Sequence, residues 1–71
     1  MKGIAINTIR VGLVYRLTNF SETFDFEVLE ALEEDNFQLK DLHTLERYEL
    51  NDLIRYGMGE DFEIIELEEG I

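Results

Sequence analysis

The chain has 71 residues and a net charge of −11, from seventeen acidic and six basic residues. This length has room for one small core, so we expect a single domain over residues 1–71. There is no cysteine, which excludes disulfides, thiolate metal sites and a cysteine nucleophile and favours a reducing compartment, taken here as the cytoplasm.

The negative charge is unevenly distributed. All seventeen acidic residues lie at or after Glu22, whereas residues 1–21 contain three basic residues and no acid. An acidic surface repels phosphate and anionic lipid, so we expect no direct nucleic-acid or membrane binding and favour a basic protein or peptide as partner. Self-repulsion favours a monomer or at most a weak homodimer. Crowded carboxylates should have raised pKa values, so added salt and lower pH should both stabilise the fold.

The first predicted element is a half-buried strand over residues 9–17. The sequence I-R-V-G-L-V-Y-R-L alternates apolar residues with a face that carries Arg10 and Arg16. A period of two is typical of a strand with one exposed face. Residues 18–21, T-N-F-S, then predict a turn.

Two similar decapeptides follow. D-F-E-V-L-E-A-L-E-E begins at Asp25, and D-F-E-I-I-E-L-E-E-G begins at Asp61. The second contains two consecutive β-branched residues and is too short for a stable helix, so it predicts a strand over 62–67. The first also has apolar residues at helical spacing, but by analogy with the second we expect a strand over 24–32. Residues 34–36, E-D-N, predict a tight turn into a strand that begins at Phe37.

Residues 37–56 allow two interpretations. In one, a strand over 37–42 leads through a turn at 43–45 to a strand over 47–50 and a short helical turn at 51–54. In the other, a helix over 44–56 begins with Thr44 as its cap and ends before Gly57. We favour the first, although Leu45 then occupies a turn position where glycine or asparagine is expected.

The first interpretation makes the chain all-β, with five short strands. The order V-G-L-V-Y, F-E-V-L-E, F-Q-L-K-D-L-H-T-L-E-R-Y-E-L and F-E-I-I-E-L, with a turn at D-L-I, resembles the SH3-like barrels of Tudor and KOW type. This resemblance covers most of residues 9–67 and implies a five-stranded barrel. The chain lacks the Asp usual after Gly12 and the Gly usual at Leu45, and its sequence order shows neither an aromatic cage nor a basic stripe. The alternative fold is α+β with the helix at 44–56.

Electrostatics predict how the strands pair. Direct pairing of the two acidic decapeptides would place glutamates opposite one another, which is destabilising. We therefore expect the strand over 9–17 to neighbour at least one of them, with Arg10 or Arg16 facing its glutamates.

Residues for catalysis are scarce. His43 is the sole histidine and Ser21 the sole serine, which does not suffice for a common zinc site or a nucleophilic triad. We expect His43 in a surface turn, and we expect no catalytic residue, metal or cofactor. The candidates for partner binding are tyrosines, whose rings suit cores and interfaces alike, and acidic side chains within or directly after the two decapeptides. They are Tyr15, Tyr48, Tyr56, Glu33, Glu34, Asp35, Glu66 and Glu68.

These observations favour a non-enzymatic interaction module that binds a basic protein partner. The alternative is a nucleic-acid mimic of the phage type, which inhibits a DNA- or RNA-binding enzyme by presenting carboxylates in place of phosphates. A mimic should carry two rows of carboxylates on one face, about 6–7 Å apart within a strand. A small enzyme or metal protein would instead need a pocket with converging carboxylates.

Overall fold

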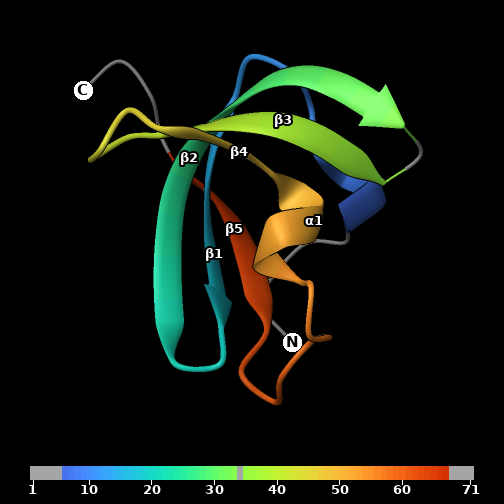
Figure 1. Ribbon diagram of the computed structural model, residues 1–71, viewed down its shortest axis with the longest axis vertical. Coiled ribbons are helices and arrows are strands. Elements are labelled where there is room, and N and C mark those ends of the chain that lie inside the picture. The colour runs from blue at the N-terminus through green and yellow to red at the C-terminus, as the bar shows by residue number, and fades with distance from the viewer. Residues whose placement is uncertain (1–5, 34, 68–71) are drawn as a thin grey trace.

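The described part of the chain forms one antiparallel sheet with a single short α-helix. The computed structural model describes residues 6–33 and 35–67. Its elements in chain order are the 3-10 turn η1 (Ile6–Thr8), β1 (Val14–Asn19), β2 (Glu22–Glu33), β3 (Asn36–Asp41), β4 (Arg47–Glu49), α1 (Leu50–Leu53) and β5 (Glu63–Leu67). The strand order across the sheet is β4-β3-β2-β1-β5 (Figure 1). The structure is therefore mostly β, as expected.

The helix expected as an alternative over residues 44–56 is wrong. Strand β4 occupies Arg47–Glu49, and α1 covers only Leu50–Leu53. The first turn of α1 is held by Asp52, whose carboxylate accepts a hydrogen bond from the Glu49 N–H at 3.0 Å. Leu50 is fully buried, so the short helix is stabilised by the core rather than by its own length.

The first strand begins later than expected. Of the predicted strand over 9–17, only residues 14–17 belong to β1; residues 9–13 contain a turn at 11–12 and no strand. Gly12 has a φ of +93°, which interrupts an extended backbone, and its N–H donates to the Val28 carbonyl at 2.8 Å. Within β1 the predicted alternation is confirmed, because Tyr15 and Leu17 are buried and Arg16 between them is exposed.

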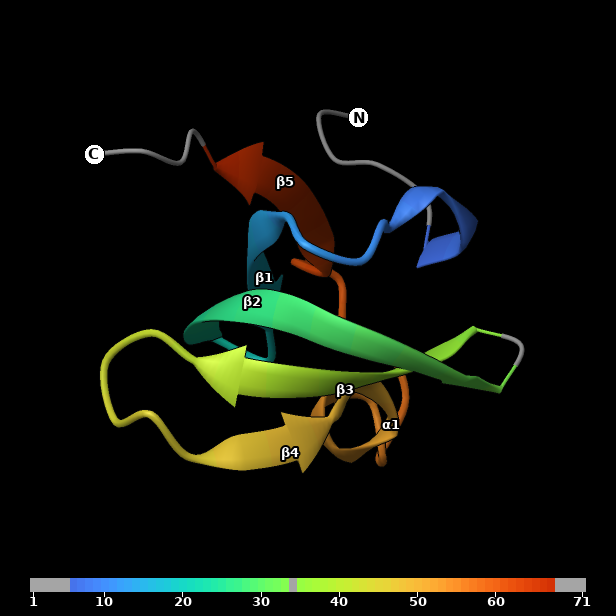
Figure 2. The same ribbon diagram turned by 90° about the horizontal axis from the view of Figure 1, so that it is seen from above.

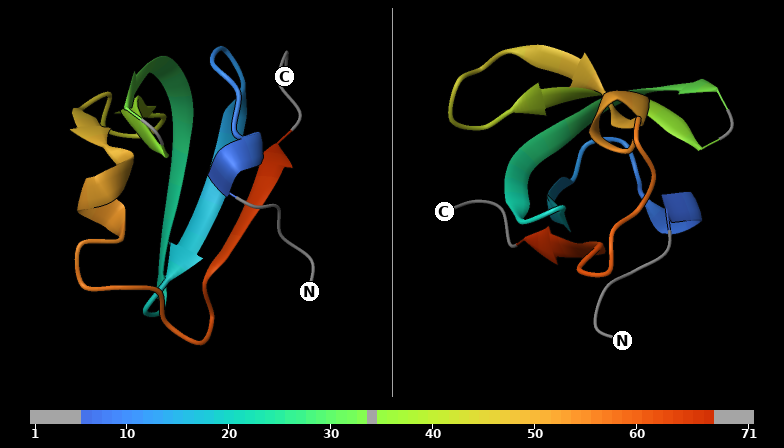
Figure 3. Two further views of the ribbon diagram at one scale, coloured as in Figure 1. Left: turned by 90° about the vertical axis from the view of Figure 1, so that its right-hand side faces the viewer. Right: turned by 60° about the horizontal axis from the view of Figure 1, so that its bottom comes forward.

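The long strand β2 bends the sheet. Its pairing with β3 shifts register between Val28 and Glu30 and again between Ala31 and Glu33. Such bulges bend a strand and increase its twist, and β2 accordingly changes direction along its length in Figure 1. Seen from above, β2, β3 and β4 form one side of the molecule (Figure 2). Figure 3 shows β4 and α1 together on one side of the molecule and β5 on the opposite side.

The strand-pairing expectation is confirmed in part. Strand β1 lies between β2 and β5 and pairs antiparallel with both, so the two acidic segments do not pair with each other. Arg16 faces Asp25, an aspartate rather than one of the expected glutamates. Arg10 lies before β1.

The core lies between the strands and α1. Its buried apolar side chains come from every strand except β4, and they include the corresponding residues Val28 and Ile64 of the two decapeptides. The buried apolar residues are Ile9, Tyr15, Leu17, Phe26, Val28, Phe37, Leu39, Leu50 and Ile64. Within the described ranges, every buried side-chain nitrogen or oxygen has a hydrogen-bond partner. None of the helices in these ranges has the length and hydrophobicity needed to span a bilayer.

Candidate functional site

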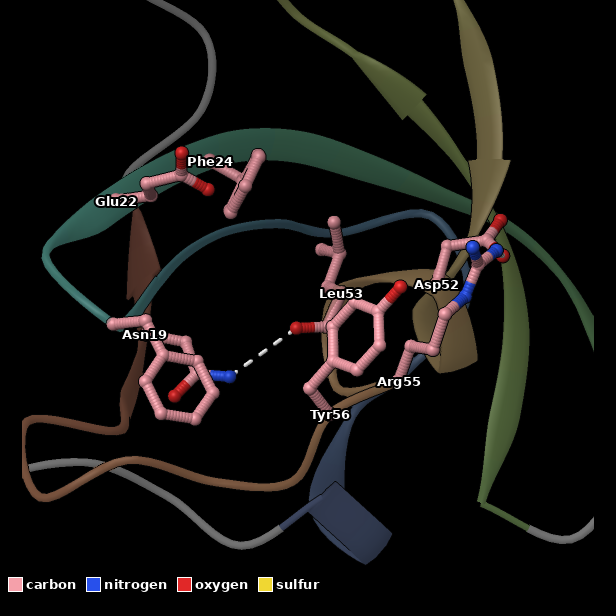
Figure 4. Close-up of a pocket in the computed structure, with 8 residues that line it drawn as sticks. Asn19, Glu22, Phe24, Asp52, Leu53, Arg55 and Tyr56 are labelled. Atoms are coloured by element: carbon pink, nitrogen blue, oxygen red, sulfur yellow. Dashed lines mark hydrogen bonds and ion pairs between the residues drawn. The ribbon is translucent and has the colours of Figure 1, made fainter.

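An aromatic groove of about 170 Å³ lies between the β1–β2 turn and the segment that follows α1. Phe20 lines it from the turn. Phe24 lines it from β2 and Tyr56 from the segment after α1 (Figure 4). Leu53 forms apolar lining, and Glu22, Asp52 and Arg55 supply charge. Residues far apart in the sequence thus combine apolar rings with carboxylates. We call this surface the aromatic groove.

Asn19 holds the two sides of the groove together. Its side chain is buried, and its Nδ2 donates to the carbonyl oxygens of Leu53 at 3.2 Å and Gly57 at 3.0 Å (Figure 4). Its Oδ1 accepts a hydrogen bond from the Gly59 N–H at 2.7 Å. One side chain at the end of β1 therefore fixes the connection between α1 and β5.

The β1–β2 turn presents Phe20 to solvent in an unusual backbone conformation. Phe20 and Ser21 have φ angles of 50° and 66° and lie between the paired residues Asn19 and Glu22. Two consecutive left-handed residues define a type I′ turn, which favours Asn-Gly. The N–H groups of Phe20 and Ser21 donate to Asp61 at 2.9 and 2.8 Å. This turn therefore displays an aromatic ring, 54% exposed, where a small polar residue would fold more easily.

The charged groups of the groove are unequally paired. Arg55 donates from a guanidinium nitrogen to Asp52 Oδ1 at 2.9 Å. The backbone N–H of Glu49, followed by this guanidinium, lowers the pKa of Asp52. Glu22 makes no side-chain hydrogen bond or ion pair with the residues that the structure describes. The groove thus contains one neutralised carboxylate and one free carboxylate.

A second polar cluster supports the β3–β4 turn. Asp41 accepts hydrogen bonds from the N–H groups of His43 at 2.7 Å and Thr44 at 2.9 Å, and from the Tyr48 hydroxyl at 2.8 Å. These donors, led by the Thr44 N–H, lower the pKa of Asp41. Burial, and next the hydrogen bond to Asp41, raises the pKa of Tyr48. The cluster stabilises a turn in which Leu45 has a φ of 66°.

Asp25 links this turn to β1. It accepts two hydrogen bonds from Arg16 and lies 3.1 Å from His43 Nε2, and the Arg16 hydrogen bond lowers the pKa of Asp25. His43 lies in the turn with a 73% exposed side chain, which confirms its expected place. Its ring has no further side-chain partner among the described residues.

The expected general rise of carboxylate pKa values is wrong for Asp25, Asp41 and Asp52. The pKa of each is lowered, because each carboxylate accepts hydrogen bonds from a guanidinium, from backbone N–H groups or from both. Local donors outweigh the negative charge of the whole chain at these three positions.

The structure separates the predicted partner-binding residues. Tyr15 lies in the core, because it is 1% exposed and its ring lies 6.3 Å from that of Phe26. Tyr48 is half-buried and packs edge-on against Phe24, whereas Tyr56 is 84% exposed and lines the aromatic groove. Of the predicted acidic residues, Glu33, Asp35 and Glu66 are exposed but do not line the groove, and Glu34 and Glu68 lie outside the described residues.

Sequence reasoning missed Phe20, Phe24, Glu22 and Asp52. One signal was available: the predicted turn T-N-F-S contains a phenylalanine where polar residues are usual. The proximity of Tyr56 to this turn had no sequence signal, because it depends on contacts that Asn19 makes across the chain.

No cluster of three or more metal-ligating side chains occurs within residues 6–33 and 35–67. Comparison with known proteins found no matching family model, no matching curated protein and no matching solved structure.

Proposed function

We propose that this protein is a non-enzymatic interaction module that binds a basic protein or peptide. The observation that carries the proposal is the aromatic groove. In it Phe20 and Tyr56 are exposed beside the carboxylate of Glu22, which has no partner among the described residues. Exposed aromatic rings provide contact area at protein interfaces, and carboxylates give orientation and a faster encounter with basic partners. The net charge of −11 attracts the same partners over a longer range.

The size of the groove supports binding rather than catalysis. Small-molecule sites usually measure about 300–1,000 Å³, whereas this groove measures about 170 Å³. It is suited to a side chain of a larger partner. The hydrogen bonds of Asp25 and Asp41 support the β3–β4 turn, which gives both carboxylates a structural role.

The arrangement of strands supports an SH3-like barrel as the finer description of the fold. Both edge strands are short, β1 pairs with β5, and a short helix connects β4 to β5. In this proposal the curved sheet closes around the core, and the aromatic groove lies at one end of the barrel.

The charge pattern on the outer face of the sheet favours the module over the nucleic-acid mimic. Residues that pair directly across strands share a face. Arg16 faces Asp25, and Lys40 faces Glu27. Positive side chains therefore interrupt the carboxylates of β2, whereas a mimic needs continuous rows of negative charge.

Binding of synthetic peptides tests the proposal. Fluorescence anisotropy should show that arginine- and lysine-rich peptides bind, that acidic peptides of equal length do not, and that added salt weakens binding. Failure of every basic peptide to bind at low salt would overturn the proposal. Salt-resistant capture of one nucleic-acid enzyme, reversed by duplex DNA, would support the mimic instead.

A further inference from the structure

We propose that the aromatic groove holds one arginine side chain of the basic partner. This inference rests on the proposed function and specifies its contact. The guanidinium would lie against the rings of Phe20 and Tyr56 and form its ion pair with Glu22.

The rings provide the first argument. Phe20, Phe24 and Tyr56 line the same groove from three separate segments, and Phe20 and Tyr56 are 54% and 84% exposed. A cation over an aromatic face is attracted by the ring's electron distribution. A guanidinium is planar and weakly hydrated, so it stacks on such faces better than an ammonium group does.

The carboxylates provide the second argument. A guanidinium already occupies the rim, because Arg55 contacts Asp52 at 2.9 Å. Glu22, in contrast, has no partner within residues 6–33 and 35–67, so it can pair with a group from outside the chain. An incoming arginine would use Glu22 and would be repelled by Arg55, so Arg55 acts as a built-in competitor in the groove.

Arg55 makes the inference testable with a matched pair of variants. Arg55→Gln and Arg47→Gln change the net charge equally, but Arg47 lies on β4 and does not line the groove. Removing Arg55 frees Asp52 and removes the repulsion, so Arg55→Gln should tighten binding of an arginine peptide by about threefold to tenfold. Arg47→Gln should change it by less than about twofold.

A second pair of variants tests the rings and the free carboxylate. Tyr56→Ala should weaken binding about fivefold to tenfold, whereas Leu45→Ala, which removes another exposed side chain outside the groove, should not. Glu22→Gln should weaken binding more than Glu30→Gln, which alters an exposed glutamate elsewhere on β2. Circular dichroism of each variant verifies folding.

The experiment titrates the full chain with three peptides that differ at one position, which holds arginine, lysine or citrulline. The arginine peptide should bind most tightly, and its addition should shift the backbone NMR signals of Phe20, Gly57 and Gly59. Equal binding of all three peptides, or equal effects of Arg55→Gln and Arg47→Gln, would overturn the arginine site. If binding still weakened with added salt in that case, the proposed interaction module would stand. Absence of binding by any basic peptide would overturn the proposed function as well.

Discussion

Arg16 and Asp25 face each other across β1 and β2, and their side chains form a two-point contact. Arg16 Nε donates to Asp25 Oδ1 at 2.8 Å, and a second guanidinium nitrogen donates to Oδ2 at 3.1 Å. Asp25 Oδ2 also contacts His43, so this pair connects β1 and β2 with the β3–β4 turn. One of the few basic residues thus neutralises the first acid of the first decapeptide.

The pH dependence of stability follows from the lowered pKa values of Asp25, Asp41 and Asp52. A carboxyl group with a folded pKa below its unfolded value of about 3.9 stabilises the fold above that pH, and this contribution is lost as pH falls through the folded value. We expect urea denaturation to show falling stability below about pH 4.

The variant Asp25→Asn provides the control, because it should lose less stability than the wild type as the pH falls below about 4. Repeating the series in added salt separates the screening of general repulsion from the local hydrogen bonds. Stability that rises steadily from pH 5 to pH 3 would contradict the assignment of these three carboxylates.

Asn19→Ala should destabilise the protein by about 2–3 kcal/mol. The substitution removes three hydrogen bonds and leaves the carbonyls of Leu53 and Gly57 and the N–H of Gly59 without their partner. Chemical denaturation measures the loss. Asn51→Ala, at an exposed position on α1, is the matched control and should lose much less stability. Equal losses of stability in the two variants would contradict the role of Asn19 in joining β1 to the segment after α1.

Leu45→Asn should stabilise the fold by about 0.5–1 kcal/mol. Leu45 has a φ of 66° and a 65% exposed side chain, so asparagine relieves backbone strain with little loss of packing. Leu42→Asn changes a neighbouring exposed leucine that lacks a positive φ and should bring no gain. The midpoint of thermal unfolding distinguishes the two, and a lower midpoint for Leu45→Asn would contradict the strain argument.

Tyr48→Phe should cost about 1 kcal/mol, because the Tyr48 hydroxyl donates to the Asp41 carboxylate at 2.8 Å. The raised pKa of Tyr48 has a separate signature. In an ultraviolet titration of the folded protein, this phenol should ionise well above the ordinary tyrosine value of about 10. Wild type and Tyr48→Phe would differ by one phenol that ionises near the ordinary value of about 10 if Tyr48 were unperturbed. That result would contradict the buried hydrogen bond.

The order of strands was predictable from the sequence to the extent that charge and periodicity specify it. Alternation around Arg16 identified β1, and the two acidic decapeptides required a basic neighbour, which is β1 between β2 and β5. The beginning of β1 was missed because Gly12 turns the backbone within an otherwise alternating pattern. The residues just before β1 continue its alternating apolar pattern although they are not part of the strand.

The site was less predictable because its residues meet through tertiary contacts. Tyr15 and Tyr56 are the same residue type, but the register of β1 buries the first and the end of α1 exposes the second. Phe20 and Tyr56 are thirty-six positions apart, and no local pattern relates them. Their meeting depends on the hydrogen bonds of Asn19, which composition and period do not encode.

The reach of Asn19 along the chain has a consequence for synthesis on the ribosome. Its partners Leu53, Gly57 and Gly59 are translated 34 to 40 residues after it. The nascent hairpin of β1 and β2 therefore emerges with Phe20 exposed, before the segment that lines the opposite side of the aromatic groove. The proposed arginine site would therefore be complete only after the segment that contains Gly57 and Gly59 has left the exit tunnel.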